Sequence, residues 1–442
     1  MKFLKSIIFA ILTWESRLIL AKYKPFIVAV TGSVGKTSTK DAIFSVLKDR
    51  NRYVRKSEKS FNSMPGLPLT VIGAPNAWRS LSGWMKNIMS GAKLIFKKNE
   101  YPDCLVLEVG ADHPNDIKSI VKWLRPDISV ITQVSDTPVH VEFFASPLEV
   151  FEEKASLAMA VKDGGTLVLF ADNPYIMELT ERVKDRGIKI ISFGTVESAN
   201  VKGSDQKTSY SGGVNGTNGT SGAPTGFAFK ITFPKESAEI GVHGLLGSTY
   251  MYPLLAAAAV GVAKNVPTTS IVNGLNSYSA PKGRMNIIAG MNGTTIIDDT
   301  YNSSPDAVAS ALKTLKSLES TGAKIAVLGD MMELGQYSAE EHRNVGKQVA
   351  ESVTELVTVG QRSRATADEA VKSGLDVTKV HSFDDSVQAG DYLKSILKSG
   401  DIALIKGSQS MRMEKAVAML MAQPEQASEL LVRQEKEWLE KK

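Results

Sequence analysis

The segment from Phe26 to Ile43 constrains the fold more than any other part of the chain. A short apolar run, Phe26 to Val30, meets a Gly-Lys-Thr turn and passes into a helical pattern. A strand, loop and helix in this order direct backbone N–H groups and a helix N-terminus at one point, which suits a polyphosphate anion. Lys36 can neutralise phosphate charge there, and the Thr37 hydroxyl can ligate Mg²⁺. The alternative is a glycine turn that only joins a strand to a helix.

The spacing of the glycines makes this loop a variant. The common phosphate loop places a first glycine where this chain has Val30, and here Gly32 stands only three residues before Gly35. We predict that a polyphosphate group binds at this loop, and the residues expected to hold it are Thr31, Gly32, Ser33, Val34, Gly35, Lys36, Thr37 and Ser38.

Length and composition are those of a globular enzyme of two or three domains. The chain has 442 residues, of which 43% are hydrophobic and 22% charged. Its single cysteine, Cys104, lies in an apolar run and has no partner for an internal disulfide, so we expect a reduced, cytoplasmic protein. No group of Cys and His residues has the spacing of a zinc site.

Short apolar runs alternate with helical patterns along the chain, which predicts an α/β fold with mainly parallel sheets. We expect a central phosphate-loop domain over residues 25–277 and a C-terminal, Rossmann-like α/β domain over residues 278–442. The Gly/Ser/Thr/Asn-rich stretch 203–226 is predicted to be a flexible surface insert. The charged tail from Gln423 is predicted to be a helix with a solvated face.

The N-terminal 24 residues are basic and predict an amphipathic helix. They carry a net charge of +4 out of +5 for the whole chain, so the remainder is near neutral and offers no basic stripe for nucleic acid. Charged residues interrupt the apolar run, which is too short to span a bilayer. We favour a helix packed on the protein, and the alternative is peripheral membrane contact through residues 1–22.

Further polar residues follow the predicted strands, where open α/β sheets bind ligands. Glu108 ends an apolar strand and is a candidate Mg²⁺ ligand, although a carboxylate there can also cap a loop. Two adjacent aspartates, Asp298 and Asp299, repel each other unless a positive or polar group lies nearby. These loops predict a site in the cleft between the two domains. By themselves, His140 would be structural and Lys154 a solvated side chain.

The chain resembles the Mur ligases from about residue 26 to residue 420. The motifs that carry the resemblance are Thr31-Gly-Ser-Val-Gly-Lys-Thr-Ser38, Asn62…Gly66-Leu-Pro68, Leu107-Glu-Val-Gly110, His140…Lys154, Gly283-Arg284-Met285, Asp298-Asp-Thr-Tyr-Asn-Ser-Ser-Pro305, Leu328-Gly-Asp-Met-Met-Glu-Leu-Gly335 and Lys406-Gly-Ser408. Within the family it is most similar to the branch that adds D-alanyl-D-alanine to a UDP-linked muramoyl tripeptide in peptidoglycan precursor synthesis. The resemblance implies ATP, Mg²⁺ and an acyl-phosphate route to the amide bond.

The resemblance also implies roles for single residues. Lys36 and the loop amides would hold the phosphates, and Thr37 and Glu108 one Mg²⁺. His140 would ligate a second metal ion, beside a carbamylated Lys154. The residues implied for the nucleotide are Arg284, Asp299 and Asn302. The residues implied for the substrates are Asn62, Asp330, Lys406 and Ser408.

The sequence departs from the family pattern in three places. Only about 25 residues precede the phosphate loop, so we expect the usual uridine-nucleotide-binding domain to be missing. Thr249 and Pro253 replace the usual His and Asn, and Lys154 is followed by Ala-Ser rather than Gly-Glu. The leading hypothesis is a monomeric ligase acting on nucleotide-linked peptides. The alternatives are a ligase of the same mechanism for another carboxylate and amine, and a non-catalytic ATP-binding scaffold.

Overall fold

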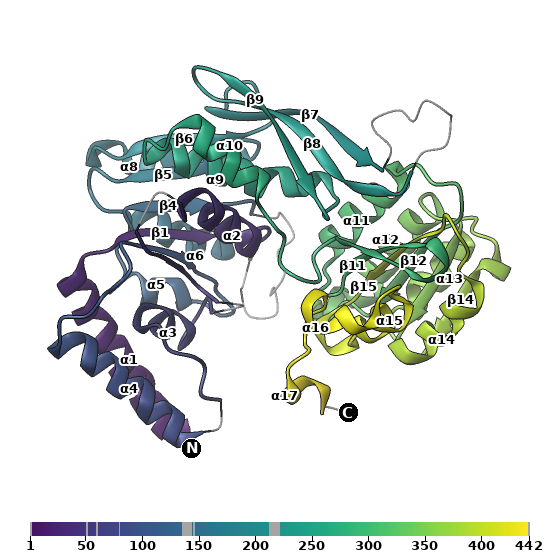
Figure 1. Cartoon of the computed structure of the whole chain (residues 1–442), viewed down its shortest axis with the longest axis horizontal. Helices are drawn as coiled ribbons and strands as arrows, with labels where there is room; N and C mark the ends of the chain where they lie inside the picture. Colours follow the sequence, from purple (N-terminus) through teal and green to yellow (C-terminus); the bar gives the residue numbers. More distant parts are fainter. Residues whose placement is uncertain are drawn as a thin grey trace. The chain divides into compact units, whose positions relative to one another are not determined.

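The computed structural model describes residues 2–49, 52–58, 61–78, 80–134, 144, 146–211 and 222–440. The chain forms two compact units. Unit 1 comprises residues 1–204, 230–240 and 250–278, and unit 2 comprises residues 205–229, 241–249 and 279–442. Figure 1 labels the elements of both. No helix in the described ranges has the length and apolar content needed to cross a membrane.

A nine-stranded sheet runs in the order β2-β3-β1-β4-β5-β6-β7-β8-β9. Its first six strands in this order pair in parallel. The strands are β1 (Phe26–Thr31), β2 (Val54–Lys56), β3 (Cys104–Glu108), β4 (Ile128–Ile131), β5 (Thr166–Phe170), β6 (Lys189–Gly194), β7 (Val201–Tyr210), β8 (Pro224–Thr232) and β9 (Ser237–His243). β1 is flanked by β3 and β4, so the predicted phosphate loop leaves the interior of the sheet.

Helices cover both faces of the parallel strands because these strands are buried on both sides. The helices α2, α9 and α10 pack together on one face, and α3, α5 and α6 lie on the other, with α1 and α4 outside α3. The helices are α1 (Lys2–Tyr23), α2 (Lys36–Leu47), α3 (Gly66–Ile72), α4 (Leu81–Phe96), α5 (Asp116–Ile120), α6 (Pro147–Met159), α7 (Pro174–Met177), α8 (Leu179–Val183), α9 (Met251–Ala263) and α10 (Thr268–Asn276). The expected N-terminal helix is α1, and it packs on the protein through Ile8, Leu12 and Ile19.

Unit 2 contains a six-stranded sheet in the order β10-β11-β15-β12-β13-β14, parallel except for β10. The strands are β10 (Asn286–Ala289), β11 (Thr295–Asp299), β12 (Lys324–Gly329), β13 (Glu355–Val359), β14 (Val380–Phe383) and β15 (Ile402–Lys406). The helices are α11 (Pro305–Ser317), α12 (Ser338–Ala350), α13 (Arg364–Lys372), α14 (Ser386–Ile396), α15 (Glu414–Leu420), α16 (Ala427–Leu430) and α17 (Lys436–Leu439). The predicted α/β class with two mainly parallel sheets is confirmed.

Two expectations about local structure were wrong. The stretch 203–226 is not one flexible insert, because β7 extends to Tyr210 and β8 begins at Pro224. A strand is held by backbone hydrogen bonds to its neighbours, so polar side chains do not prevent it. The tail from Gln423 is not one helix but contains the short helices α16 and α17, because Leu431 and Arg433 between them are buried.

Candidate active site

The phosphate loop joins β1 to α2 and packs tightly against the end of β4. A Cβ atom at Gly32 would lie 1.9 Å from the Thr132 hydroxyl oxygen, so only glycine fits there. Gly35 precedes α2 with a φ of 83°, in the left-handed region that favours glycine. The backbone N–H of Ser33 donates to the Gln133 carbonyl at 2.8 Å. These contacts fix the path of the loop.

The predicted phosphate-binding side chains lie on this loop and on the first turn of α2. The Lys36 ammonium folds over the loop and donates to the carbonyls of Gly32 at 2.9 Å and Ser33 at 3.2 Å. The hydroxyl oxygens of Ser33 and Thr39 are buried without a hydrogen-bond partner in the part of the chain that the structure describes. Polar atoms of this kind, beside a helix N-terminus, fit a bound polyphosphate.

Glu108 lies next to this loop because β3 pairs with β1, where its register partner is Val30. Its side chain is 2% exposed, and Oε1 accepts a hydrogen bond from the Asn62 amide at 3.2 Å. Oε2 is buried without a partner among the described residues. A free carboxylate oxygen close to the loop fits a Mg²⁺ ligand, since Mg²⁺ binds through one or two carboxylates together with substrate phosphates. Asn62, expected at the substrate, is the residue that donates this hydrogen bond to Glu108.

Lys154 lies on α6 and is buried, with 5% of the residue exposed. Burial, together with the positive charge of Lys36, lowers the pKa of its amine from 10.5 to about 7, against an opposing effect of Glu153. The influence of Lys36 links this amine to the phosphate loop. The expectation that Lys154, taken alone, is solvated was wrong. His140 lies outside the described residues.

The two glutamates before Lys154 have different roles. Glu152 is on the surface and pairs with Arg182 at 2.8 Å. Glu153 is buried and accepts hydrogen bonds from the N–H groups of Asn115, Ile117 and Lys118, which caps the start of α5. The side chain of Glu153 is therefore used to join α6 to α5.

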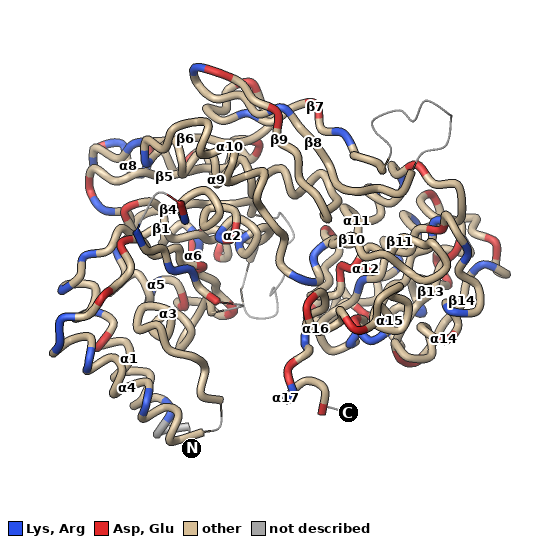
Figure 2. Tube along the Cα trace, in the orientation of Figure 1, with Lys and Arg blue, Asp and Glu red and all other residues tan. Residues whose placement is uncertain are grey.

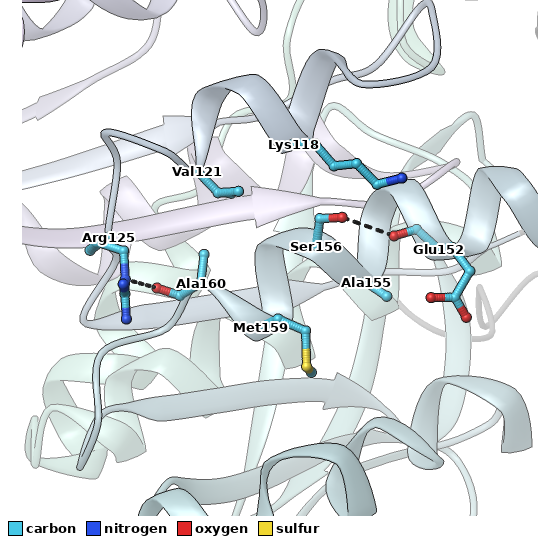
Figure 3. A pocket seen from close by; sticks show the side chains of 8 residues that line it. All are labelled: Lys118, Val121, Arg125, Glu152, Ala155, Ser156, Met159 and Ala160. Atoms are coloured by element: carbon cyan, nitrogen blue, oxygen red, sulfur yellow. Dashed lines mark hydrogen bonds between the residues drawn. The ribbon is translucent and has the colours of Figure 1, made fainter.

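A pocket of about 390 Å³ lies between α5 and α6, but it is separate from the phosphate loop. Figure 3 shows its lining, with Glu152, Ser156 and Met159 on one side of α6. Lys154 is on the opposite side of this helix, because residues two positions apart are separated by more than half a turn. The pocket holds none of the residues expected to act on ATP.

In unit 2, the two adjacent aspartates have different environments. Asp299 forms a buried ion pair with Lys406, whose ammonium lies 2.6 Å from Oδ2 and also donates to the Asn302 carbonyl at 2.9 Å. Asp298 is fully buried, and Oδ1 accepts a hydrogen bond from the Thr300 hydroxyl at 2.6 Å. Burial raises the pKa of Asp298 to about 7, which favours its neutral form, and Lys406 neutralises Asp299, so the expected repulsion is reduced.

The loop after β12 is held by its neighbours. The Ser408 N–H donates to the Asp330 carbonyl at 3.1 Å, and the Ser408 hydroxyl accepts from Met332 N–H at 2.9 Å. The Asp330 carboxylate accepts from Ser363 N–H at 2.8 Å. His342 Nε2 accepts from Met331 N–H, and burial lowers the pKa of this imidazole ring. Asp330 and Ser408 therefore lie together, at the ends of adjacent strands β12 and β15.

Arg284 stacks its guanidinium on the Tyr301 ring at 4.2 Å from the ring centre. The backbone of the same loop is held from the C-terminal tail, because Arg433 donates to the carbonyls of Thr300, at 3.0 Å, and Tyr301. Arg433 also pairs with the buried Glu414 at 3.1 Å. The structure thus brings Arg284 to the loop that contains Asp299 and Asn302.

Comparison with known families identifies both parts of the chain. Residues 30–261, more than half of it, match the Mur ligase middle domain, and residues 283–409 match the Mur ligase glutamate ligase domain. The chain belongs to the Mur ligase family. This Mur ligase is therefore an enzyme that forms an amide bond with consumption of ATP.

Curated relatives and solved structures agree with this family. The Mur ligase is 26% identical, over 402 residues, to the UDP-N-acetylmuramoyl-tripeptide–D-alanyl-D-alanine ligase of Bacillus subtilis (strain 168), covering 90% of this chain and 76% of the relative. It is 28% identical to the ligase of the same name from Mycobacterium leprae, covering 87% of this chain and 71% of the relative. The fold is similar to MurF from Acinetobacter baumannii, with a TM-score of 0.73 and 23% identity, covering 94% of this chain and 80% of that one. It is also similar to MurF ligase from Thermotoga maritima in complex with ADP, with a TM-score of 0.73 and 24% identity, covering 93% of this chain and 83% of that one.

Sequence reasoning missed residues that hold this Mur ligase's site in place. Lys40 on α2 is 2% exposed and donates to the Ser57 carbonyl at 2.8 Å, while the Ser57 hydroxyl accepts from the Glu108 N–H. Glu153 and Arg433 were also missed. Lys40 follows Lys36 by one helical turn, and this spacing is the only sequence signal that could have pointed to it.

Proposed function

We propose that this Mur ligase joins D-alanyl-D-alanine to the terminal carboxylate of a UDP-linked muramoyl tripeptide. The names of the curated relatives support this reaction, which provides precursors for peptidoglycan. Because ATP and nucleotide-linked precursors are cytoplasmic, we place the reaction in the cytoplasm. The observation that carries the proposal is the combination of the phosphate loop, the free oxygen of Glu108 and the neutralised Lys154 in one unit.

The reaction has two steps. An oxygen of the substrate carboxylate forms a bond to the γ-phosphorus of ATP, the bond from that phosphorus to the bridging oxygen breaks, and ADP leaves. The dipeptide amine then forms a bond to the acyl carbon, the bond to the phosphate oxygen breaks, and the nitrogen loses a proton. Both steps bring anions or a nucleophile to a charged centre, so positioning and charge neutralisation supply most of the catalysis.

We assign the triphosphate to the loop amides of residues 31–38 and to Lys36. The ammonium group of Lys36 already lies over two loop carbonyls and reaches a bound phosphate by a change of side-chain rotamer. Thr37 and Glu108 are the proposed Mg²⁺ ligands, and the unpaired Oε2 of Glu108 supports this choice. The ion would supply positive charge beside the transferred phosphoryl group.

Lys154 and His140 are the proposed ligands of a second metal ion at this site. With a pKa of about 7, the Lys154 amine is largely neutral at cellular pH and can add CO₂, which would convert it into an anionic carbamate. A carbamate would reverse the charge beside Lys36 and is a suitable metal ligand. In unit 2 we propose Arg284, Asp299 and Asn302 as nucleotide contacts. Asp330, Lys406 and Ser408 are the proposed substrate-side residues.

Phosphate release tests the proposal. Purified protein is given ATP, Mg²⁺, the UDP-linked tripeptide and D-alanyl-D-alanine, and each component is omitted in turn. We expect turnover only with the full set, loss of at least a hundredfold in Lys36→Met, and little change in the matched control Lys122→Met on the surface. Turnover only with another carboxylate and amine would replace this substrate pair. ATP binding without turnover on any pair would favour a scaffold.

A further inference from the structure

The two outer helices of unit 1, α1 and α4, expose an unusual number of large apolar side chains. Eight of the seventeen such side chains exposed in the described part of the chain belong to these helices or to the turn before α4: Ile7, Trp14, Leu18, Trp78, Leu81, Met85, Met89 and Phe96. Phe96 is 81% exposed and Met89 is 67% exposed. On each helix they recur at helical spacing, so each helix has an apolar stripe on its solvent side.

The stripes belong to one surface. α1 and α4 lie side by side, as Figure 1 shows, and they run in the same direction because Phe9 contacts Trp84 while Lys22 donates to the Leu94 carbonyl. Both helices bury their other side in the same core. We call their exposed residues the α1/α4 face.

The α1/α4 face is also strongly basic. Its exposed cations include Lys5, Arg17, Lys22, Lys86 and Lys93, and the exposed Lys97 directly follows α4; no carboxylate forms an ion pair with any of them within the described ranges. Figure 2 shows Lys and Arg along both helices. The only acidic residue in the sequences of α1 and α4 is Glu15, which is buried. The face thus has positive charge without negative charge.

A small pocket opens where both helices begin. It measures about 300 Å³ and is lined by Lys5, Phe9, Pro65, Asn76, Trp78 and Trp84. The Trp84 indole N–H donates to the Trp78 carbonyl at 3.2 Å, so the two tryptophans are held together. Trp84 is buried in the core, whereas Trp78 and Trp14 are exposed, and exposed tryptophans at the edge of an apolar surface are typical of proteins that meet the interface between lipid and water.

We propose that the α1/α4 face docks on the surface of a membrane that contains anionic lipids. The apolar stripes enter the boundary between headgroups and acyl chains, and the lysines and Arg17 pair with the lipid phosphates. A second copy of the chain is a poorer occupant, because a symmetric pair would bring these cations together with no opposite charge to compensate them. Docking keeps the enzyme at the bilayer surface and does not depend on the proposed substrates.

Co-sedimentation of the full chain with vesicles tests the proposal. We expect binding to vesicles of equal parts phosphatidylcholine and phosphatidylglycerol, and little binding to phosphatidylcholine alone. Raising the salt from about 0.1 M to about 1 M shortens the screening length from about 10 Å to about 3 Å and should release much of the protein. Protein that remains in solution with both kinds of vesicle would overturn the proposal.

Two variants separate the apolar and the basic contributions. Met89→Ser with Phe96→Ser should weaken binding to anionic vesicles by roughly tenfold or more. Lys86→Gln with Lys93→Gln and Lys97→Gln should weaken it by roughly a hundredfold. All five side chains are exposed, so circular dichroism should show unchanged folding.

The matched control changes two equally exposed apolar residues of unit 1 that lie off the face, Leu148→Ser with Tyr175→Ser, and it should bind as the unmodified chain does. Equal loss of binding in this control and in the Met89/Phe96 variant would overturn the assignment to the α1/α4 face. Sedimentation velocity without lipid tests whether the α1/α4 face binds a second copy of the chain. A dimer that dissociates in Phe96→Ser would assign the face to a second copy and overturn the proposal.

Discussion

The pKa of Lys154 allows a direct test of the chemistry proposed for unit 1. With a pKa of about 7, about three quarters of this amine is neutral at about pH 7.5, whereas a lysine at the ordinary value of 10.5 is neutral in about one molecule in a thousand. Only the neutral amine adds CO₂. Lys154 should therefore form a carbamate several hundredfold more readily than an ordinary exposed lysine of the same chain.

The assay is ¹³C NMR of the protein in labelled bicarbonate. We expect one carbamate resonance that is absent in Lys154→Met and present in the exposed control Lys122→Met. It should weaken as the pH falls below about 7, because the amine then becomes protonated. Lys36→Met should also weaken it at neutral pH, because loss of the Lys36 charge raises the pKa of Lys154.

Stability gives an independent measure of the same pKa. The folded-state pKa lies below the unfolded value, so between about pH 7 and 10.5 the unfolded chain holds the extra proton and stability rises with pH. Below about pH 7, the cost of the buried ammonium is complete. Lys154→Met removes this cost, and its gain in unfolding free energy should be about 2–3 kcal/mol larger at about pH 6 than at about pH 9. A gain that is independent of pH, or an unchanged carbamate resonance in Lys154→Met, would refute the reasoning.

Three further perturbations test how the site and its supports are held. Burial raises the pKa of Glu15 to about 7, so the free energy of unfolding should fall as the pH rises from about 4.5 to 7. Glu15→Gln should remove about 1–2 kcal/mol of that fall, measured by urea unfolding with tryptophan fluorescence. Arg433→Met should cost about 3 kcal/mol in the same measurement, because the carbonyls of Thr300 and Tyr301 lose their donor and the buried Glu414 keeps only Arg412 as a charge partner among the described residues. Gly32→Ala should abolish ATP binding in calorimetry, since the added Cβ would lie 1.9 Å from the Thr132 hydroxyl oxygen. The control Gly241→Ala places its Cβ in open space, so this variant should bind ATP normally.

The sequence predicted the elements that depend on local pattern. The strand β1, the phosphate loop and α2 follow from a short apolar run and two glycines. The prediction of one helix after Gln423 was wrong. The charged composition of this tail is typical of a solvated helix, but the buried residues Leu431 and Arg433 interrupt it.

The candidate site could be predicted only in part, because its residues come from distant segments. Asp299 and Lys406 were each expected near a ligand, but their ion pair depends on β15 lying beside β11, across more than a hundred residues. Asn62 was expected at a substrate, and its hydrogen bond to Glu108 also joins segments far apart in the chain. No periodicity within a segment contains this information.

By itself, the sequence determined the segment of strand, loop and helix formed by β1 and α2, with a phosphate loop that begins at Thr31, since these depend on side-chain period and on glycine. Only the tertiary structure decided which charges are buried. The lowered pKa of Lys154, the raised pKa of Asp298 and the basic α1/α4 face arise when distant segments exclude water from some ionisable groups and leave others exposed. Desolvation is a property of the packed molecule, and it has no counterpart in a local stretch of sequence.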